Sequence, residues 1–131
     1  MDWKYILTSF QGRINRQPYW LAAIAMGIVF GILFYVIMAA FGSITPSADP
    51  AVPASMSFSP IGWVLMAILY IALIWVSLAV QVKRWHDRDK SGWWVIASLI
   101  PIVNIWAFIV TGFLRGTPGP NSYGEDPLAG R

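Results

Sequence analysis

Three long apolar runs, none interrupted by a charged residue, dominate the pattern of hydrophobic and polar positions. They cover residues 19–41, 61–82 and 93–114. An α-helix rises about 1.5 Å per residue, so roughly 20 residues cross a hydrocarbon core about 30 Å thick. Each run is therefore long enough to span a bilayer. The pattern predicts an all-α membrane protein with about three transmembrane helices in a single domain, residues 1–131.

The first run is expected to be a retained membrane span. Three basic side chains precede it, which imitates the start of a signal peptide. However, the run is 23 residues long, whereas the apolar region of a signal peptide has roughly 7–15 residues. The length therefore favours a transmembrane helix.

The third run contains a break point near its centre. Pro101 lacks a backbone donor and its ring clashes with the preceding helical turn, and Asn104 follows closely. We favour one proline-kinked spanning helix, which would place the tail on the outer side of the membrane. The alternative is a re-entrant segment or a helical hairpin, in which two half-helices enter and leave on the same side.

Shorter segments flank the runs. Four apolar side chains of residues 2–10 share one helical face, which predicts a short interfacial amphipathic helix. They are Trp3, Ile6, Leu7 and Phe10. Residues 42–60 are rich in Pro, Ser and Ala, a composition that predicts a flexible loop. The tail, 115–131, is rich in Gly and Pro, so disorder is the default expectation.

One residue of the tail suggests a more specific arrangement. Tyr123 lies among the turn formers and hints that the tail folds back onto the protein. Glu125 and Asp126 would then meet the basic loop that follows the second run. This contact requires both segments on the same side of the membrane, and it therefore favours the hairpin.

The uneven distribution of basic residues predicts the orientation. Three precede the first run and four follow the second, whereas the 42–60 loop has none. The positive-inside rule places the N-terminus and the 83–92 loop in the cytoplasm. A single third span would leave seven basic residues inside and two outside, and a hairpin would place all nine inside.

Composition excludes several classes of function. The chain is 57% hydrophobic and only 11% charged, against roughly 25% charged residues in soluble domains. The net charge of +3 does not indicate nucleic-acid binding, because the basic residues adjoin the spans, where they set topology and contact lipid head groups. The absence of cysteine excludes disulfides, thiolate metal sites and cysteine nucleophiles. No cofactor is expected.

Residues 83–94 concentrate the ionisable side chains. They include the only histidine, His86, beside Asp87, and this pair would be the catalytic candidate if the protein were an enzyme. Adjacent residues on a helix do not face each other, so the pair needs a turn or a third partner. One His and two Asp are too few for a zinc site, so no metal is expected.

A structural role for this segment is the simpler hypothesis. Arg84, Asp87 and Arg88 would pair with one another and with carbonyls at helix ends. Four residues would start the third helix and anchor it at the interface. They are Ser91, Gly92, Trp93 and Trp94.

Five basic side chains are the candidates for binding anions or lipids. Arg13 and Arg16 are three residues apart, so on a helix they would share a face and clamp a phosphate. Anionic head groups would attract the basic residues of the 83–92 loop by about 1 kcal/mol each. The candidate set is Arg13, Arg16, Arg84, Arg88 and Lys90.

Three motifs in order carry a family resemblance. They are Phe10-x-Gly12-Arg13-x-x-Arg16-x-x-Tyr19-Trp20, Arg84-x-His86-Asp87-x-x-Lys90-Ser91-Gly92-Trp93-Trp94 and Gly116-Thr117-Pro118-Gly119-x-Asn121-x-Tyr123-Gly124-x-Asp126-Pro127. Together they resemble DUF805, a bacterial inner-membrane family of unknown function. The departures are Asp89 where members often have Gly, Ser122 where a basic residue is common, and Glu125 where Pro is usual. The resemblance implies a multi-pass protein of the bacterial inner (plasma) membrane and adds no reaction.

Three functions stay open. The leading hypothesis is a non-enzymatic protein that binds anionic lipid head groups or a partner membrane protein. One alternative is an enzyme acting on a lipid or isoprenoid phosphate, with His86 as general acid or base and Asp87 as its orienting group. The other is a transporter or channel component, which would have to be an oligomer because no ionisable residue lies within the spans.

Gly27 and Gly31 form a GxxxG pair that favours close approach of another helix, from this chain or from a second copy.

Overall fold

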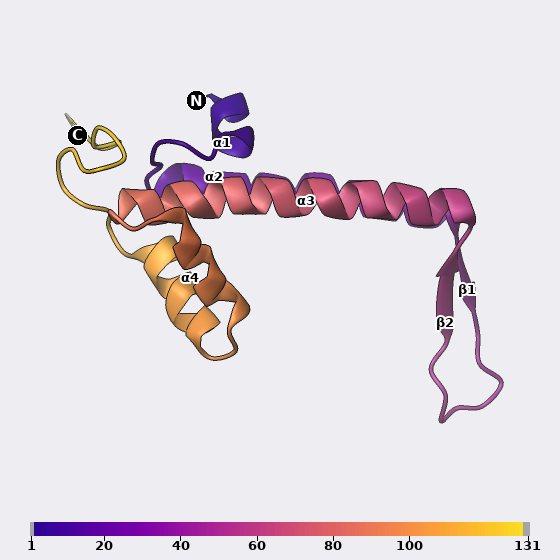
Figure 1. Ribbon diagram of the computed structural model, residues 1–131. Coiled ribbons are helices and arrows are strands. Elements are labelled where there is room, and N and C mark those ends of the chain that lie inside the picture. Colours follow the sequence, from indigo (N-terminus) through magenta and orange to yellow (C-terminus); the bar gives the residue numbers. More distant parts are fainter. Residues whose placement is uncertain (1, 130–131) are drawn as a thin grey trace. The chain divides into compact units, whose positions relative to one another are not determined.

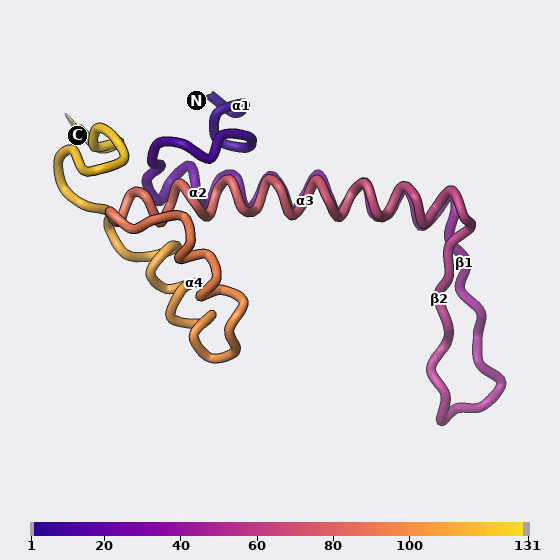
Figure 2. The backbone as a smooth tube through the Cα atoms, in the orientation of Figure 1, coloured from indigo at the N-terminus to yellow at the C-terminus, as the bar shows by residue number. Residues whose placement is uncertain are grey.

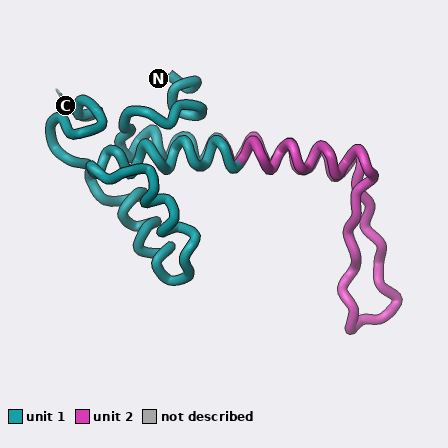
Figure 3. Tube along the Cα trace, in the orientation of Figure 1, with its two compact units in different colours: residues 1–25, 74–131 teal, residues 26–73 magenta. Residues whose placement is uncertain are grey.

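The computed structural model describes residues 2–129, and the chain is mainly helical (Figure 1). It divides into two compact units, Met1–Ala25 with Ile74–Arg131, and Met26–Leu73 (Figure 3). The elements in order are α1 (Trp3–Thr8), α2 (Arg16–Phe41), β1 (Gly42–Thr45), β2 (Ser55–Phe58), α3 (Pro60–Asp87), the 3-10 helix η1 (Gly92–Leu99) and α4 (Val103–Phe113).

The first two apolar runs form the long helices α2 and α3. Both are long and apolar enough to cross a membrane. Pro18 lies in the first turn of α2, where its missing N–H costs no helical hydrogen bond. The second helix does not end at residue 82 as the sequence predicted, because the charged residues that follow contain no helix breaker. They continue α3 for more than one further turn, to Asp87.

A left-handed residue ends α3. Asp89 has φ 58°. The N–H of Lys90 donates to the carbonyl of Trp85 at 3.0 Å, and the N–H of Asp89 donates to that of His86 at 2.9 Å. These two bonds form a Schellman motif, whose left-handed position is usually occupied by Gly. The Asp at this position tolerates the left-handed conformation better than most side chains do.

The second unit contains a β-hairpin where the sequence predicted a flexible loop and an all-α fold. The strands β1 and β2 pair antiparallel, with Gly42 opposite Phe58 and Thr45 opposite Ser55. The prediction failed because it averaged composition over the whole of 42–60. Three of its four prolines lie in the connection between the strands, and Pro60 begins α3, so no proline interrupts the pairing.

The third run is a helical hairpin, and the favoured single kinked helix is wrong. The chain reverses at residues 100–102, and η1 and α4 lie side by side (Figure 2). Ile100 is extended because it precedes Pro101, and Ile102 has φ 71°. A single continuous helix therefore cannot include these residues. With 8 and 11 residues, the arms are each about 16 Å long, roughly half the thickness of a hydrocarbon core.

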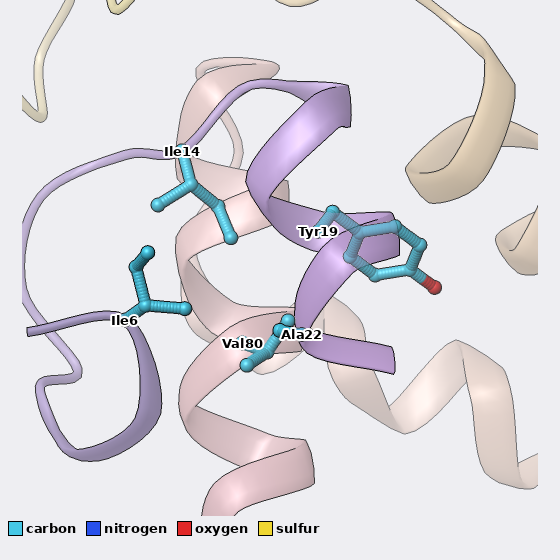
Figure 4. Packing of buried hydrophobic residues seen from close by; sticks show 5 residues of the cluster. All are labelled: Ile6, Ile14, Tyr19, Ala22 and Val80. Atoms are coloured by element: carbon cyan, nitrogen blue, oxygen red, sulfur yellow. The ribbon is translucent and has the colours of Figure 1, made fainter. Parts of the chain in front are cut away.

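The first unit has two small apolar cores. One joins α1, α2 and α3 through Ile6, Ile14, Tyr19, Ala22 and Val80 (Figure 4). The other joins α3 to the hairpin through Trp85, Ala97, Ala107 and Val110. The helix α1 covers part of the segment expected to be an interfacial amphipathic helix, and its Ile6 packs against the protein. Its neighbour Trp3 is 41% exposed.

Candidate functional site

The last five residues of α3, segment 83–87, are all buried although four of them are ionisable. Their relative exposures are 0, 0, 0, 9 and 2% for Lys83, Arg84, Trp85, His86 and Asp87. Charged side chains are rarely this buried unless they are paired. The contacts of these side chains reach the N-terminal residues, the hairpin and the tail, so this segment connects the three.

Asp87 is bound by two arginines. Its Oδ1 accepts from Arg13 Nε at 2.9 Å, and its Oδ2 accepts from Arg84 Nη1 at 2.6 Å. All three side chains are at most 3% exposed. Charge-assisted hydrogen bonds of this kind are short and about twice as strong as neutral ones. The predicted pairing of Arg84 with Asp87 is therefore present, and Arg13 joins it from 74 residues away.

The remaining donors of Arg13 hold the tail. Its Nη2 donates to Thr117 O at 2.6 Å and its Nη1 to Gly119 O at 2.9 Å. Asp126 Oδ1 lies 4.0 Å from Arg13 Nη2. Hydrogen bonds from the backbone N–H groups of Leu128 and Gly119 lower the pKa of the Asp126 carboxyl below its ordinary value. The tail thus folds back as Tyr123 suggested, and disorder was the wrong default for its described residues.

Lys83 stabilises the end of α1. Its Nζ donates to Tyr5 O at 3.0 Å, to Ile6 O at 2.7 Å and to Ser9 O. The Ile6 and Ser9 carbonyls lie in the last turn of α1 and just beyond it, where backbone acceptors lack a helical partner. The Tyr5 carbonyl also accepts from the Ser9 N–H at 3.2 Å. A cation at this position also complements the negative end of the helix dipole. The sequence predicted topology and lipid contact for Lys83, and this role at the end of α1 was not predicted.

His86 is held by contacts that do not include Asp87. Its Nδ1 lies 2.8 Å from Gly12 O, and because a carbonyl only accepts, Nδ1 carries the proton. The Tyr123 ring stacks on the imidazole at 4.0 Å with an interplanar angle of 4°. Asn121 Nδ2 donates to the His86 carbonyl at 2.9 Å. The Asp87 carboxylate faces two arginines instead, so within residues 2–129 the pair does not form a catalytic dyad.

Three arginines bind three consecutive carbonyls at the end of α4. Arg16 Nη1 donates to Phe113 O at 2.9 Å, Arg84 Nη2 donates to Leu114 O, and Arg88 Nη1 donates to Arg115 O at 2.6 Å. These acceptors are the unpaired carbonyls at the negative end of the helix. The contacts match the predicted pairing of Arg84 and Arg88 with helix ends. They also connect the N-terminus of α2 to the hairpin.

The predicted phosphate clamp of Arg13 and Arg16 is not formed. Arg13 precedes α2 and points to Asp87, whereas Arg16 begins the helix and points to Phe113. The two side chains therefore have different partners and share no helical face. A clamp would need both arginines on one helix, but Arg13 follows Gly12, whose φ of 87° belongs to an irregular segment before α2.

The residues predicted to start the third helix have mixed roles. Ser91 lies at the N-cap of η1 but makes no side-chain capping bond. Gly92 packs close to Val82, and Trp93 is 79% exposed. Trp94 stacks near Trp85 at 5.8 Å and lies under the Lys90 ammonium at 5.2 Å. Within the described residues no cluster of three or more His, Cys, Asp or Glu side chains is present.

Gly116 is required by its close approach to Asp87. A Cβ built there would collide with Asp87 Oδ2 and lie 2.6 Å from the Asp87 carbonyl oxygen. Gly116→Ala is therefore expected to destabilise the protein by about 1–3 kcal/mol, the usual range for overpacking a buried site. The measurement is thermal unfolding of the purified protein in a neutral detergent.

Gly27→Ala is the matched control, because a Cβ at Gly27 meets no atom within 4 Å. Alanine there should be neutral or stabilise α2 by about 0.5–1 kcal/mol. Equal melting temperatures for the two variants would contradict the close packing of the tail against Asp87.

Known proteins resemble this chain over nearly its whole length. The family described as "Protein of unknown function (DUF805)" matches residues 7–125. The chain is 30% identical to "Inner membrane protein YhaH" of Escherichia coli K12, covering 97% of both chains. It is 29% identical to "Inner membrane protein YhaI" of the same strain, over 92% of this chain and 87% of the relative. The "Uncharacterized protein YiiR" is 29% identical over 92% and 86%. No solved structure matches.

Proposed function

This chain belongs to the DUF805 family and is an integral inner-membrane protein. We propose that it is a non-enzymatic protein that binds anionic lipid head groups. The contacts come from the outer arginines, which we define as Arg16, Arg88 and Arg115, with Lys90 nearby. The observation that carries the proposal is the convergence of arginines on the end of α4.

The topology that supports this function has two crossings and one hairpin. Helices α2 and α3 cross the bilayer, and the hairpin of η1 and α4 enters and leaves on one side. Arg84, before the hairpin, donates to Leu114, after it, so both ends of the hairpin lie together. All nine basic residues of the chain then fall on the cytoplasmic side, as the positive-inside rule favours. The helix α1 lies at the interface with Trp3 toward the lipid.

The outer arginines keep donors for a ligand. A guanidinium has five N–H donors, and Arg16 and Arg88 each donate once, to the carbonyls at the end of α4. Arg16 and Arg115 are exposed, and Phe113 and Leu114 beside them are 54 and 40% exposed. Cations next to exposed apolar side chains suit the boundary between head groups and acyl chains.

Arg88 supplies a second supporting observation. Its Nε is buried and has no hydrogen-bond partner within residues 2–129. A buried donor without an acceptor is costly, and a phosphate oxygen is the acceptor that a guanidinium prefers. Arg13 and Arg84, by contrast, are engaged by Asp87 and by carbonyls, so we assign them to the architecture. The contacts of His86 and Asp87 favour an architectural role for these residues too.

The test compares lipid binding of the wild type with that of Arg16→Gln, Arg88→Gln and Arg115→Gln combined. Binding of short-chain phosphatidylglycerol and phosphatidylcholine is measured in a neutral detergent by native mass spectrometry. The triple variant should bind phosphatidylglycerol at least about ten-fold more weakly at low salt, because each cation contributes about 1 kcal/mol. Added salt should reduce the difference.

Lys4→Gln is the matched control, because Lys4 is an exposed cation on α1, outside the outer arginines. This variant should retain wild-type affinity within about two-fold. Unchanged phosphatidylglycerol binding by the triple variant at low salt, or equal binding of the two lipids by the wild type, would overturn the proposal.

A further inference from the structure

A cavity of about 340 Å³ lies between α3, η1 and α4. Four of its seven lining residues carry uncharged polar groups and the other three are apolar, so no lining residue is ionisable. The lining consists of Gln81, Ser98, Asn104, Ile105, Ala107, Phe108 and Thr111. Polar side chains are rare in membrane segments and usually mark a ligand path or a site. Gln81 comes from α3, Ser98 from η1, and Asn104 and Thr111 from α4, so the hairpin and α3 together form the polar lining.

The hydroxyl groups of the cavity have their hydrogens engaged by carbonyls. Thr111 Oγ1 donates to Ala107 O at 2.8 Å, and Ser98 Oγ donates to Val95 O at 2.5 Å. Both oxygens therefore present lone pairs, which accept hydrogen bonds. Tyr19 Oη lies 3.4 Å from Thr111 Oγ1 and donates to it, which leaves Thr111 one lone pair for a ligand.

The two amides of the cavity are left largely unpaired. Gln81 Nε2 makes one long hydrogen bond to Tyr19 Oη, at 3.5 Å. The Asn104 side chain makes none within the part of the chain that the structure describes, although its backbone N–H donates to Ile100 O at 2.8 Å. Each amide carries two donors and an acceptor. Asn104 is exposed and Gln81 is half-buried. With the hairpin in the bilayer, as proposed above, these amides need a hydrogen-bonding partner that hydrocarbon cannot supply.

We propose that this cavity binds an uncharged lipid whose polar part carries hydroxyl and ester groups, with diacylglycerol as the simplest member. The amides of Asn104 and Gln81 donate to its ester carbonyls, and the oxygens of Ser98 and Thr111 accept from its hydroxyl. The wall formed by Ile105, Ala107 and Phe108 receives the start of the acyl chains.

Charge and size select this class of ligand. A charged head group would lose its hydration in the cavity without a counter-charge to replace it, because no lining residue is ionisable. A cavity of 340 Å³ lies at the lower end of the range of about 300–1,000 Å³ for small-molecule sites, enough for a glycerol unit with its ester groups. The amphiphilic lining favours a lipid over a cluster of waters alone.

This site is separate from the proposed anionic-lipid contacts. None of the cavity residues is one of the outer arginines, and none binds Asp87 through its side chain. The neutral-lipid site therefore goes beyond the function proposed above. Failure of one proposal leaves the other intact, because one is tested with a neutral lipid and the other with an anionic one.

The test is photo-crosslinking of the full-length protein, reconstituted in phosphatidylcholine nanodiscs, with a diazirine-bearing diacylglycerol. Labelling should be saturable, should fall on residues 93–114, and should be competed by unlabelled diacylglycerol. Asn104→Leu with Gln81→Leu should weaken labelling by at least about five-fold, since one hydrogen bond is worth roughly that factor. Ser77→Ala is the control, because Ser77 is a polar residue of α3 outside the cavity, and it should leave labelling unchanged.

Thermal unfolding of the double variant in a neutral detergent reports whether it is still folded. Competition between lipids for labelling of the wild-type protein provides a second test, which needs no variant. Competition by phosphatidylglycerol as strong as by diacylglycerol would overturn the assignment to an uncharged ligand. Labelling that does not saturate, or that the folded double variant retains in full, would overturn the site itself and leave the cavity to water.

Discussion

Replacing Asp87 with asparagine is expected to be the most destabilising of the conservative substitutions in this protein. The change removes the charge that Arg13 Nε and Arg84 Nη1 approach at 2.9 and 2.6 Å. Two guanidinium groups with exposures of 2 and 0% would then lack a counter-charge. Breaking a buried ion pair by removing one partner typically costs about 3–5 kcal/mol.

The loss should extend to the tail and to the N-terminal segment, because both are held through Arg13. In Asp87→Asn, limited proteolysis is therefore expected to cut within residues 115–129 at protease concentrations that leave the wild type intact. The melting temperature in detergent should fall together with this protection. Expression and membrane insertion should persist, since α2 and α3 do not depend on the ion pairs for their hydrophobicity.

Asp89→Asn is the matched control for this substitution. It removes the same charge two residues away, and Asp89 is exposed. Its carboxylate accepts from the Ser122 N–H at 3.1 Å, and an asparagine oxygen can accept that bond. Asparagine also tolerates the left-handed conformation at this position. A cost below about 1 kcal/mol is expected, and a wild-type melting temperature for Asp87→Asn would contradict the buried network.

The tail is expected to lie on the same side of the membrane as the N-terminus. The chain contains no cysteine, so single cysteines can be introduced at Gln11, Ser47 and Ser122, all exposed positions. A membrane-impermeant maleimide applied to intact spheroplasts should label Ser47→Cys only. The expected contrast is nearly all-or-none, because a bilayer separates the reagent from the other two positions.

Permeabilised cells provide the control, since all three cysteines should then react. Labelling of Ser122→Cys together with Ser47→Cys in intact cells would show that the third run crosses the membrane. That result would separate the tail from Arg13 in the native membrane, and it would contradict the contacts on which the binding proposal depends. Labelling of Gln11→Cys and Ser122→Cys without Ser47→Cys would reverse the proposed orientation.

The sequence alone was sufficient for the features that depend on local composition. The apolar runs identify α2 and α3 because burial in lipid requires only that consecutive side chains be apolar. The Gly and Pro residues identify the turns of the tail, and the three motifs identify the family. The end of α3 was misplaced because charge was taken to end the helix, whereas the left-handed Asp89 ends it.

Only the tertiary structure decided which charged side chains are buried in ion pairs and which are exposed. Arg13, Arg16, Arg84 and Arg88 are the same residue type in similar local surroundings, yet Arg13 and Arg84 are buried against Asp87 while Arg16 is exposed. The hydrogen-bond acceptors of the Arg13 guanidinium lie 74 to 111 residues away in the chain. No local pattern encodes such distant pairs, because they form only after the hairpin has returned the chain to the end of α3.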